Sequence, residues 1–147
     1  MRFLSILSVS VLLSSCSKFT VAQFHLRDRQ MAIQNVDAIK AETKYRFGNA
    51  VSSQEYRDKL GQYYVCRWST SIADDQRGTV VVELNYRQAK TGQEIQSKSQ
   101  EVSARKGKVE FAITGDEYLQ RGKVLAWQAE VKQNGRVLAS EQSFLWE

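Results

Sequence analysis

The sequence predicts a mostly β protein, folded as an antiparallel β-sandwich. Apolar and polar residues alternate in several stretches between residues 62 and 147, and turn residues separate these stretches at intervals of about 8–12 residues. Asn134-Gly135 favours a two-residue hairpin turn, because both residues accept a positive φ at low cost. The chain has 147 residues, 42% of them hydrophobic, which suits one domain with one core. It has no proline, so a proline-rich linker is excluded.

The first predicted strand spans residues 21–26. Phe24 and Leu26 alternate with polar neighbours, and this pattern places His25 on the polar side of the strand. His25 is the only histidine in the chain. We interpret it as a surface residue without a catalytic or ligand role.

The stretch 31–47 is ambiguous. Ile33, Val36 and Ile39 have helical spacing, whereas residues 39–47 alternate at strand spacing. We favour a strand over residues 37–47, because threonine, tyrosine and phenylalanine prefer a pleated surface. A helix is the alternative.

One short helix is predicted near residues 53–60. Ser52 can cap its first turn, and Glu55, three residues later, completes a capping box. Gly61 would end the helix in the left-handed conformation.

The strands predicted after residue 60 all show period-two alternation. They span residues 62–70, 79–88, 94–103, 109–113 and the two arms of a hairpin within 123–146. Lys98 marks the polar stretch 94–103 as an edge strand, since a lysine discourages edge-to-edge pairing. Residues 105–108 and 115–117 are predicted turns, and the last hairpin should pair from Gln133 and Arg136.

Trp68 and Trp127 are the predicted centre of the core. Each lies on the apolar side of its strand. Burial of each side chain would contribute about 2–3 kcal/mol.

Residues 1–16 differ from the rest of the chain. Arg2 precedes an apolar run over residues 3–13, which is shorter than the roughly 20 residues of a membrane-spanning helix but suits a secretory signal. The run ends in Leu13-Ser14-Ser15-Cys16, which resembles the lipobox of bacterial lipoproteins.

The lipobox resemblance implies cleavage before Cys16 and attachment of diacylglycerol to its thiol. The chain would then divide into a signal peptide (1–15), an anchor with the first strand (16–30) and a single β-sandwich domain (31–147). Ser17 after the cysteine suggests the outer membrane by the sorting rule of that family. An ordinary secretory signal with a nearby cleavage site is the alternative.

Cys66 is the only other cysteine. Its apolar neighbours favour a buried thiol that acts as a small hydrophobic residue. If Cys16 is unmodified, a disulfide between Cys16 and Cys66 is the alternative in an oxidising compartment.

The strand pattern over residues 62–147 is similar to immunoglobulin-like and fibronectin type III-like sandwiches of bacterial surface proteins. The likeness concerns the architecture. The disulfide pair of immunoglobulin domains is missing, because Cys66 alone is available.

The sequence offers little catalytic or cofactor chemistry, and we expect no cofactor and no metal. It has no glycine-rich phosphate loop and no GxSxG elbow, and one histidine is too few for a typical zinc site. Asp74-Asp75 and Asp116-Glu117 are adjacent carboxylates, which usually belong to solvated turns. An envelope hydrolase using paired carboxylates is one alternative function.

We therefore expect a non-enzymatic binding or assembly module, anchored in the bacterial envelope by a lipid on Cys16. Its partner would be an envelope protein or a glycan, and a glycan-binding module is a second alternative. The net charge of +5 is spread along the chain, and export argues against nucleic acid. The candidate contact residues are Tyr63, Arg87, Arg105 and Lys106.

Overall fold

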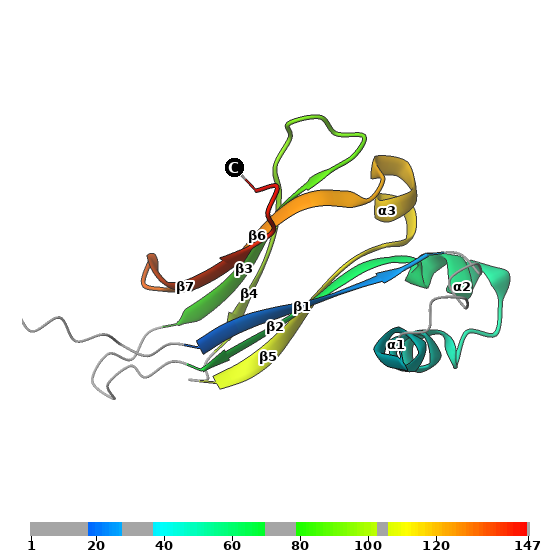
Figure 1. Ribbon diagram of the computed structural model, residues 1–147, viewed down its shortest axis with the longest axis horizontal. Helices are drawn as coiled ribbons and strands as arrows, with labels where there is room; N and C mark the ends of the chain where they lie inside the picture. Colours follow the sequence, from blue (N-terminus) through cyan, green and yellow to red (C-terminus); the bar gives the residue numbers. More distant parts are fainter. Residues whose placement is uncertain (1–17, 28–36, 70–78, 103–105, 147) are drawn as a thin grey trace, which may run out of the picture.

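Two antiparallel sheets form an open sandwich, which confirms the predicted fold class (Figure 1). The computed structural model describes residues 18–27, 37–69, 79–102 and 106–146. One sheet has the order β1-β2-β5 and the other β4-β3-β6-β7. The strands are β1 (Lys18–Leu26), β2 (Gly61–Ser69), β3 (Val80–Gln88), β4 (Gln96–Val102), β5 (Lys106–Thr114), β6 (Val124–Gln133) and β7 (Arg136–Gln142). The chain crosses between the sheets after β2, β4 and β5.

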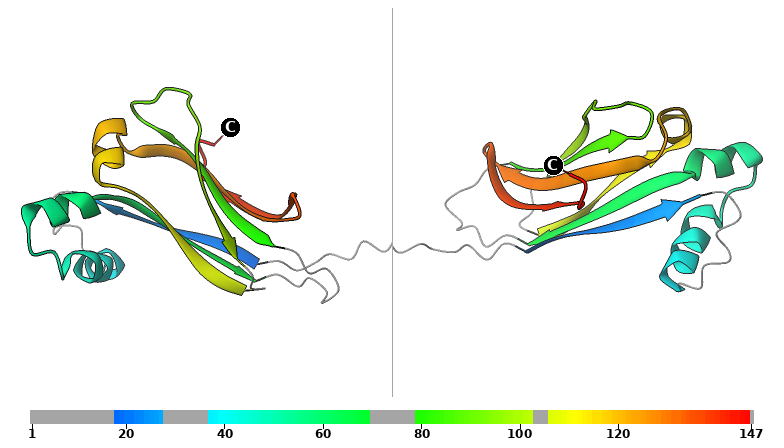
Figure 2. Two further views of the ribbon diagram at one scale, coloured as in Figure 1. Left: turned by 180° about the vertical axis from the view of Figure 1, so that it is seen from behind. Right: turned by 45° about the horizontal axis from the view of Figure 1, so that its top comes forward.

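Three helices lie at one end of the sandwich, and β1 begins at the opposite end (Figures 1 and 2). They are α1 (Asp37–Phe47), α2 (Ser53–Lys59) and α3 (Gly115–Arg121). None of the helices in the described ranges is long and apolar enough to span a bilayer.

The core lies between the sheets and contains both predicted tryptophans. Trp68 is 5% exposed and Trp127 8% exposed, so the prediction for the core is confirmed. The Tyr64 ring lies against Trp127 in an edge-on arrangement, with 5.6 Å between the ring centroids. The alternation predicted for residues 79–88 is also confirmed, because every second residue of β3 is buried.

The two faces of β1 are the reverse of the prediction. His25 pairs with Gln62 and therefore shares the face that looks toward the other sheet. Phe24 pairs with Tyr63 on the outer face, where Leu26 is also buried. At this end of β1 the outer face of the sheet is also covered, so Leu26 and Tyr63 are buried there beside the helices. The interpretation of His25 as a surface residue is wrong.

Residues 37–47 form helix α1, so the predicted strand is wrong. Lysine, glutamate and arginine are strong helix formers, and they occupy the positions between the alternating residues. Glu42 and Arg46 form an ion pair one turn apart, and Phe47 stacks on Tyr56 of α2. The helical alternative is correct.

Helix α2 confirms the helix and capping box expected near residues 53–60. The Ser52 hydroxyl accepts a bond from the Glu55 backbone, and the Glu55 carboxylate accepts one from the Ser52 backbone. Gly61 has the positive φ expected of it, 147°, directly after the C-cap Leu60. Leu60 is extended, and Gly61 is also the first residue of β2.

Two predicted turns are regular elements. Residues 106–108 begin strand β5, and residues 115–117 form the first turn of α3. The hairpin at Asn134-Gly135 is confirmed, since both residues have positive φ and Gln133 pairs with Arg136.

Candidate functional site

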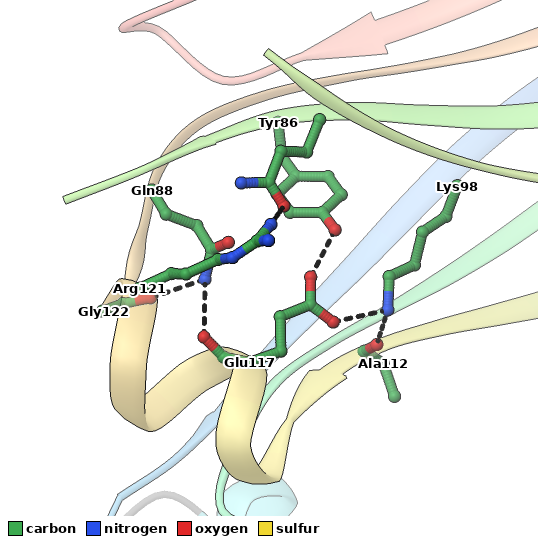
Figure 3. Close-up of polar contacts among 8 residues, drawn as sticks. Tyr86, Gln88, Lys98, Ala112, Glu117, Arg121 and Gly122 are labelled. Carbon is green, nitrogen blue, oxygen red and sulfur yellow. Dashed lines mark hydrogen bonds and ion pairs between the residues drawn. The ribbon is translucent and has the colours of Figure 1, made fainter. Parts of the chain in front are cut away.

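Glu117 on α3 is the centre of a polar cluster at the helical end of the sandwich (Figure 3). Its carboxylate accepts a hydrogen bond of 2.5 Å from the Tyr86 hydroxyl and forms a 2.8 Å ion pair with Lys98. The Lys98 ammonium also donates to the carbonyl of Ala112, at 2.8 Å. Lys98 on β4 therefore joins its own sheet to α3 and to β5 of the opposite sheet.

Gln88 continues the cluster below α3. Its side chain is fully buried, and its amide nitrogen donates to the carbonyls of Gly122, at 2.8 Å, and Glu117, at 3.4 Å. The side-chain oxygen of Gln88 has no hydrogen-bond partner among the described residues. Burial, and then the bond to Glu117, raise the pKa of Tyr86, so this hydroxyl remains a donor. The cluster is suited to holding α3 in place.

His25 contacts the other side of α3. Its Nε2 lies 2.7 Å from the Tyr118 hydroxyl, and Arg27 Nε donates to its Nδ1 at 3.2 Å. Burial, followed by the charges of Arg27 and Lys123, lowers the pKa of His25 to about 4. The imidazole is therefore neutral near pH 7.

A shallow depression of about 320 Å³ lies where α1 and α2 meet the outer face of β2. Its lining combines two aromatic rings with basic and amide groups: Tyr45, Arg46, Asn49, Lys59 and Tyr63. Tyr45 is 79% exposed, whereas Tyr63 is 6% exposed. A ring beside an ammonium and an amide can stack on a sugar and bond its hydroxyl or carboxylate groups.

Arg46, in the lining of this depression, contacts an aromatic ring and two carboxylates. Its guanidinium lies 3.7 Å from the centroid of the Tyr63 ring. It also pairs with Glu110 at 2.6 Å and with Glu42 at 2.8 Å. The hydrogen bond to Glu110 is the main cause of the raised pKa of Arg46. With its charge neutralised here, Arg46 leaves Lys59 as the cation that a ligand would meet.

The contact residues named from the sequence do not form one site. Tyr63 lies under Arg46, and Lys106 is exposed at the opposite end of the sandwich, at the start of β5. Arg87 lies on the other sheet, where it donates to the Leu145 carbonyl at 3.2 Å and lies 5.2 Å from the centroid of Trp146. Arg105 and Cys16 are outside the described residues.

Besides the two carboxylates that Arg46 binds, one further pair in the described ranges is held by a lysine. Glu83 and Glu130 lie opposite each other on β3 and β6, and Lys132 bridges them at 3.0 and 2.9 Å. A hydrogen bond from Asn85 is the main cause of the lowered pKa of Glu83. Of the predicted pairs, Asp74-Asp75 is outside the described residues, and Glu117 is bound by Lys98. Such neutralised groups suit structural roles better than acid–base catalysis.

The described residues contain no group of three or more histidine, cysteine, aspartate or glutamate side chains arranged to hold a metal ion. Cys66 is 0% exposed, in agreement with the expected buried thiol. Burial, and then the charge of Glu141, raise its pKa to about 12.

Sequence reasoning missed the cluster at α3 and most of the depression. The cluster had a signal, because Gly122 after Arg121, and acidic residues after Gly115, are typical of the two ends of a helix. The depression depends on α1, which the sequence analysis interpreted as a strand. No family model, no curated protein and no solved structure matches this chain.

Proposed function

We propose that this chain is a lipid-anchored protein of the bacterial cell envelope, in the outer membrane, and that it acts as a non-enzymatic binding or assembly module. The observation that carries the proposal is the sequence Leu13-Ser14-Ser15-Cys16, which follows an apolar run and ends two residues before β1 at Lys18. An acylated Cys16 would be joined to the sandwich almost without a linker.

The arrangement of the fold supports this role. Lys18 lies at the end of the sandwich opposite the three helices (Figure 1). An anchor at Cys16 would hold that end at the bilayer and direct α1, α2 and α3 away from it. The depression beside Tyr45 would then face the space in which a partner is met.

A glycan is the partner that the depression favours. Tyr45 offers an exposed ring, and Lys59 and Asn49 lie beside it as a cation and an amide. These groups match the apolar faces and the hydroxyl or carboxylate groups of sugars. A glycan-binding module is therefore the more specific form of the proposal, and an envelope protein is the other partner.

Metabolic labelling with a fatty acid tests the anchor. Cells that express the full chain and grow with alkyne-tagged palmitate should give a labelled protein in the membrane fraction. A Cys16→Ser variant should lose the label. The matched control, Cys66→Ala, should keep it, because Cys66 is buried in the core. Equal labelling of the Cys16→Ser variant would contradict the anchor.

Co-sedimentation with isolated peptidoglycan sacculi tests the glycan site. Tyr45→Ala should weaken binding several-fold, since it removes the exposed ring of the depression. Val51→Ala is the control, because Val51 is 93% exposed and does not line the depression. Equal binding by both variants would contradict this use of the depression.

A further inference from the structure

The outer face of the three-stranded sheet changes character along its length. Near the helices it buries Leu26, Tyr63 and Val65. At the opposite end it carries four exposed cations, which we call the basic rim: Lys18, Arg67, Lys106 and Lys108.

Strand register gathers these four cations on one face. Arg67 lies directly opposite Lys108, and Ser69, two residues along β2, lies between Lys18 and Lys106. Residues opposite each other, and residues two apart on one strand, share a face of the sheet. Arg67 and Lys108 are therefore two positive charges directly opposite each other on paired strands. Such a pair destabilises a sheet when no counter-charge is present.

No carboxylate among the described residues forms an ion pair with the basic rim. Glu110 lies two residues from Lys108 on β5, and the charge of Lys108 helps to lower its pKa, but the Glu110 carboxylate is bound by Arg46 at 2.6 Å. None of the four cations takes part in an ion pair within the described ranges. The connection between β2 and β3 contains Asp74, Asp75 and Arg77, a net charge of −1 by sequence, against +4 on the rim.

The basic rim also lies at the end of the sandwich that the proposed lipid anchor would hold at the membrane. Lys18 is the second residue after Cys16, and an extended chain covers at most about 3.6 Å per residue, so the two lie within roughly 7 Å. The Debye length at physiological ionic strength is about 8 Å. Lys18 therefore lies within about one Debye length of the proposed anchor, a distance over which a cation is still attracted to an anionic bilayer surface.

We infer that the basic rim binds the anionic phospholipid headgroups of the membrane that holds Cys16, and so fixes the orientation of the sandwich on the bilayer. The inference rests on the proposed lipid anchor. Headgroup phosphates would supply counter-charge to Arg67 and Lys108, which form no ion pair within the described ranges. The outer face of one sheet then has two uses, burial beneath the helices at one end and membrane contact at the other.

Lysine footprinting on vesicles tests the inference. The acylated full-length protein is reconstituted on vesicles of pure phosphatidylcholine and on vesicles of phosphatidylcholine mixed with phosphatidylglycerol. Acetylation of each lysine is then followed by mass spectrometry. We expect Lys18, Lys106 and Lys108 to react several-fold more slowly on the anionic vesicles at low salt, and high salt to remove the difference. Lys44 on α1 is exposed and should react equally on both.

A charge-reversal variant that should not destabilise the fold separates a loss of membrane contact from a loss of folding. Lys108→Glu places opposite charges across the β2–β5 pair, so the sheet should be as stable as before or more stable. It should nevertheless reduce the protection of Lys18 and Lys106, whereas Lys44→Glu should not.

The anchor and the basic rim can fail separately. Sedimentation with uncharged phosphatidylcholine vesicles depends on the acyl chains, and its absence would contradict the anchor. Sedimentation with equal reactivity of Lys18, Lys106 and Lys108 on both kinds of vesicle would overturn the basic rim. Protection of Lys44 together with the rim lysines would overturn it as well, because the protein would then lie flat or unoriented.

Discussion

Gly107 lies opposite Trp68 across the β2–β5 pair, and the indole takes up the space of the missing side chain. A Cβ on Gly107 would lie 2.7 Å from Cζ2 and 2.8 Å from Cη2 of Trp68, closer than van der Waals contact. Position 107 therefore has room for glycine but not for a larger residue, because the Trp68 ring fills the adjacent space.

Gly107→Ala should destabilise the protein by about 1–3 kcal/mol, because the Trp68 ring must move in a packed core. Urea unfolding followed by tryptophan fluorescence measures the change. Ser99→Ala is the control, since Ser99 is exposed on the edge strand β4 and its removal should change the free energy of unfolding little. An unfolding midpoint for Gly107→Ala equal to that of the control would show that the ring is not confined.

Tyr86→Phe should lower the free energy of unfolding by about 1–2 kcal/mol, because it removes a hydrogen bond to the Glu117 carboxylate. Tyr45→Phe provides a matched control, since the Tyr45 ring is mostly exposed. Chemical denaturation of both variants measures the difference. If both unfold like the wild type, the cluster does not hold α3.

The stability of the protein should fall as the pH is lowered from about 6.5 to about 4. His25 has a pKa of about 4 in the fold and an ordinary value of 6.5. The unfolded chain therefore binds a proton in this window that the folded chain does not, and acid favours unfolding. The stability that His25 contributes is complete above pH 6.5. Because the ring is half-buried, we expect a loss of the order of 1 kcal/mol.

His25→Gln should flatten this pH dependence. Urea midpoints at pH 7 and pH 5 measure it, and these values lie above the range in which carboxylates such as Glu83 and Glu110 take up protons. A variant with the same slope as the wild type would mean that another group is responsible.

Cys66 should be inert toward Ellman's reagent in the native protein at pH 8. The thiol is fully buried and its pKa is raised to about 12, so thiolate is scarce and inaccessible. In urea the thiol should react within the mixing time of an ordinary assay. Rapid reaction of the native protein would place Cys66 at the surface.

The strands after residue 60 could be predicted because a sandwich keeps one face of each strand in the core. Val80, Val82 and Leu84 are buried while their neighbours are less so, and period-two alternation is therefore visible in the sequence. The hairpin was equally accessible, since Asn134-Gly135 fixes both the turn and the register.

Helices α1 and α3 were harder to recognise for different reasons. In α1 the alternation of Thr43, Tyr45 and Phe47 imitates a strand, although the intervening residues favour a helix. Helix α3 has seven residues, too few to show a helical period. The face of β1 was reversed because both faces of that strand contact other parts of the protein.

The candidate site could not be predicted because its contacts join residues that are far apart in the chain. Glu117 meets Tyr86 and Lys98 only after the sheets have stacked and α3 has formed. The residue types alone do not show that these three side chains come within hydrogen-bond distance of one another. Likewise, Arg67 and Lys108 form part of one basic rim only through the register of β2 with β5.

The most direct measurement of the central claim is mass spectrometry of the N-terminus of the mature protein. Trypsin should release the peptide Cys16-Ser17-Lys18, which we expect to carry a diacylglycerol thioether on Cys16. The wild-type chain should contain no peptide from residues 1–15. A mature chain that begins at another residue, or a peptide in which Cys16 is a free thiol, would contradict the lipid-anchored account.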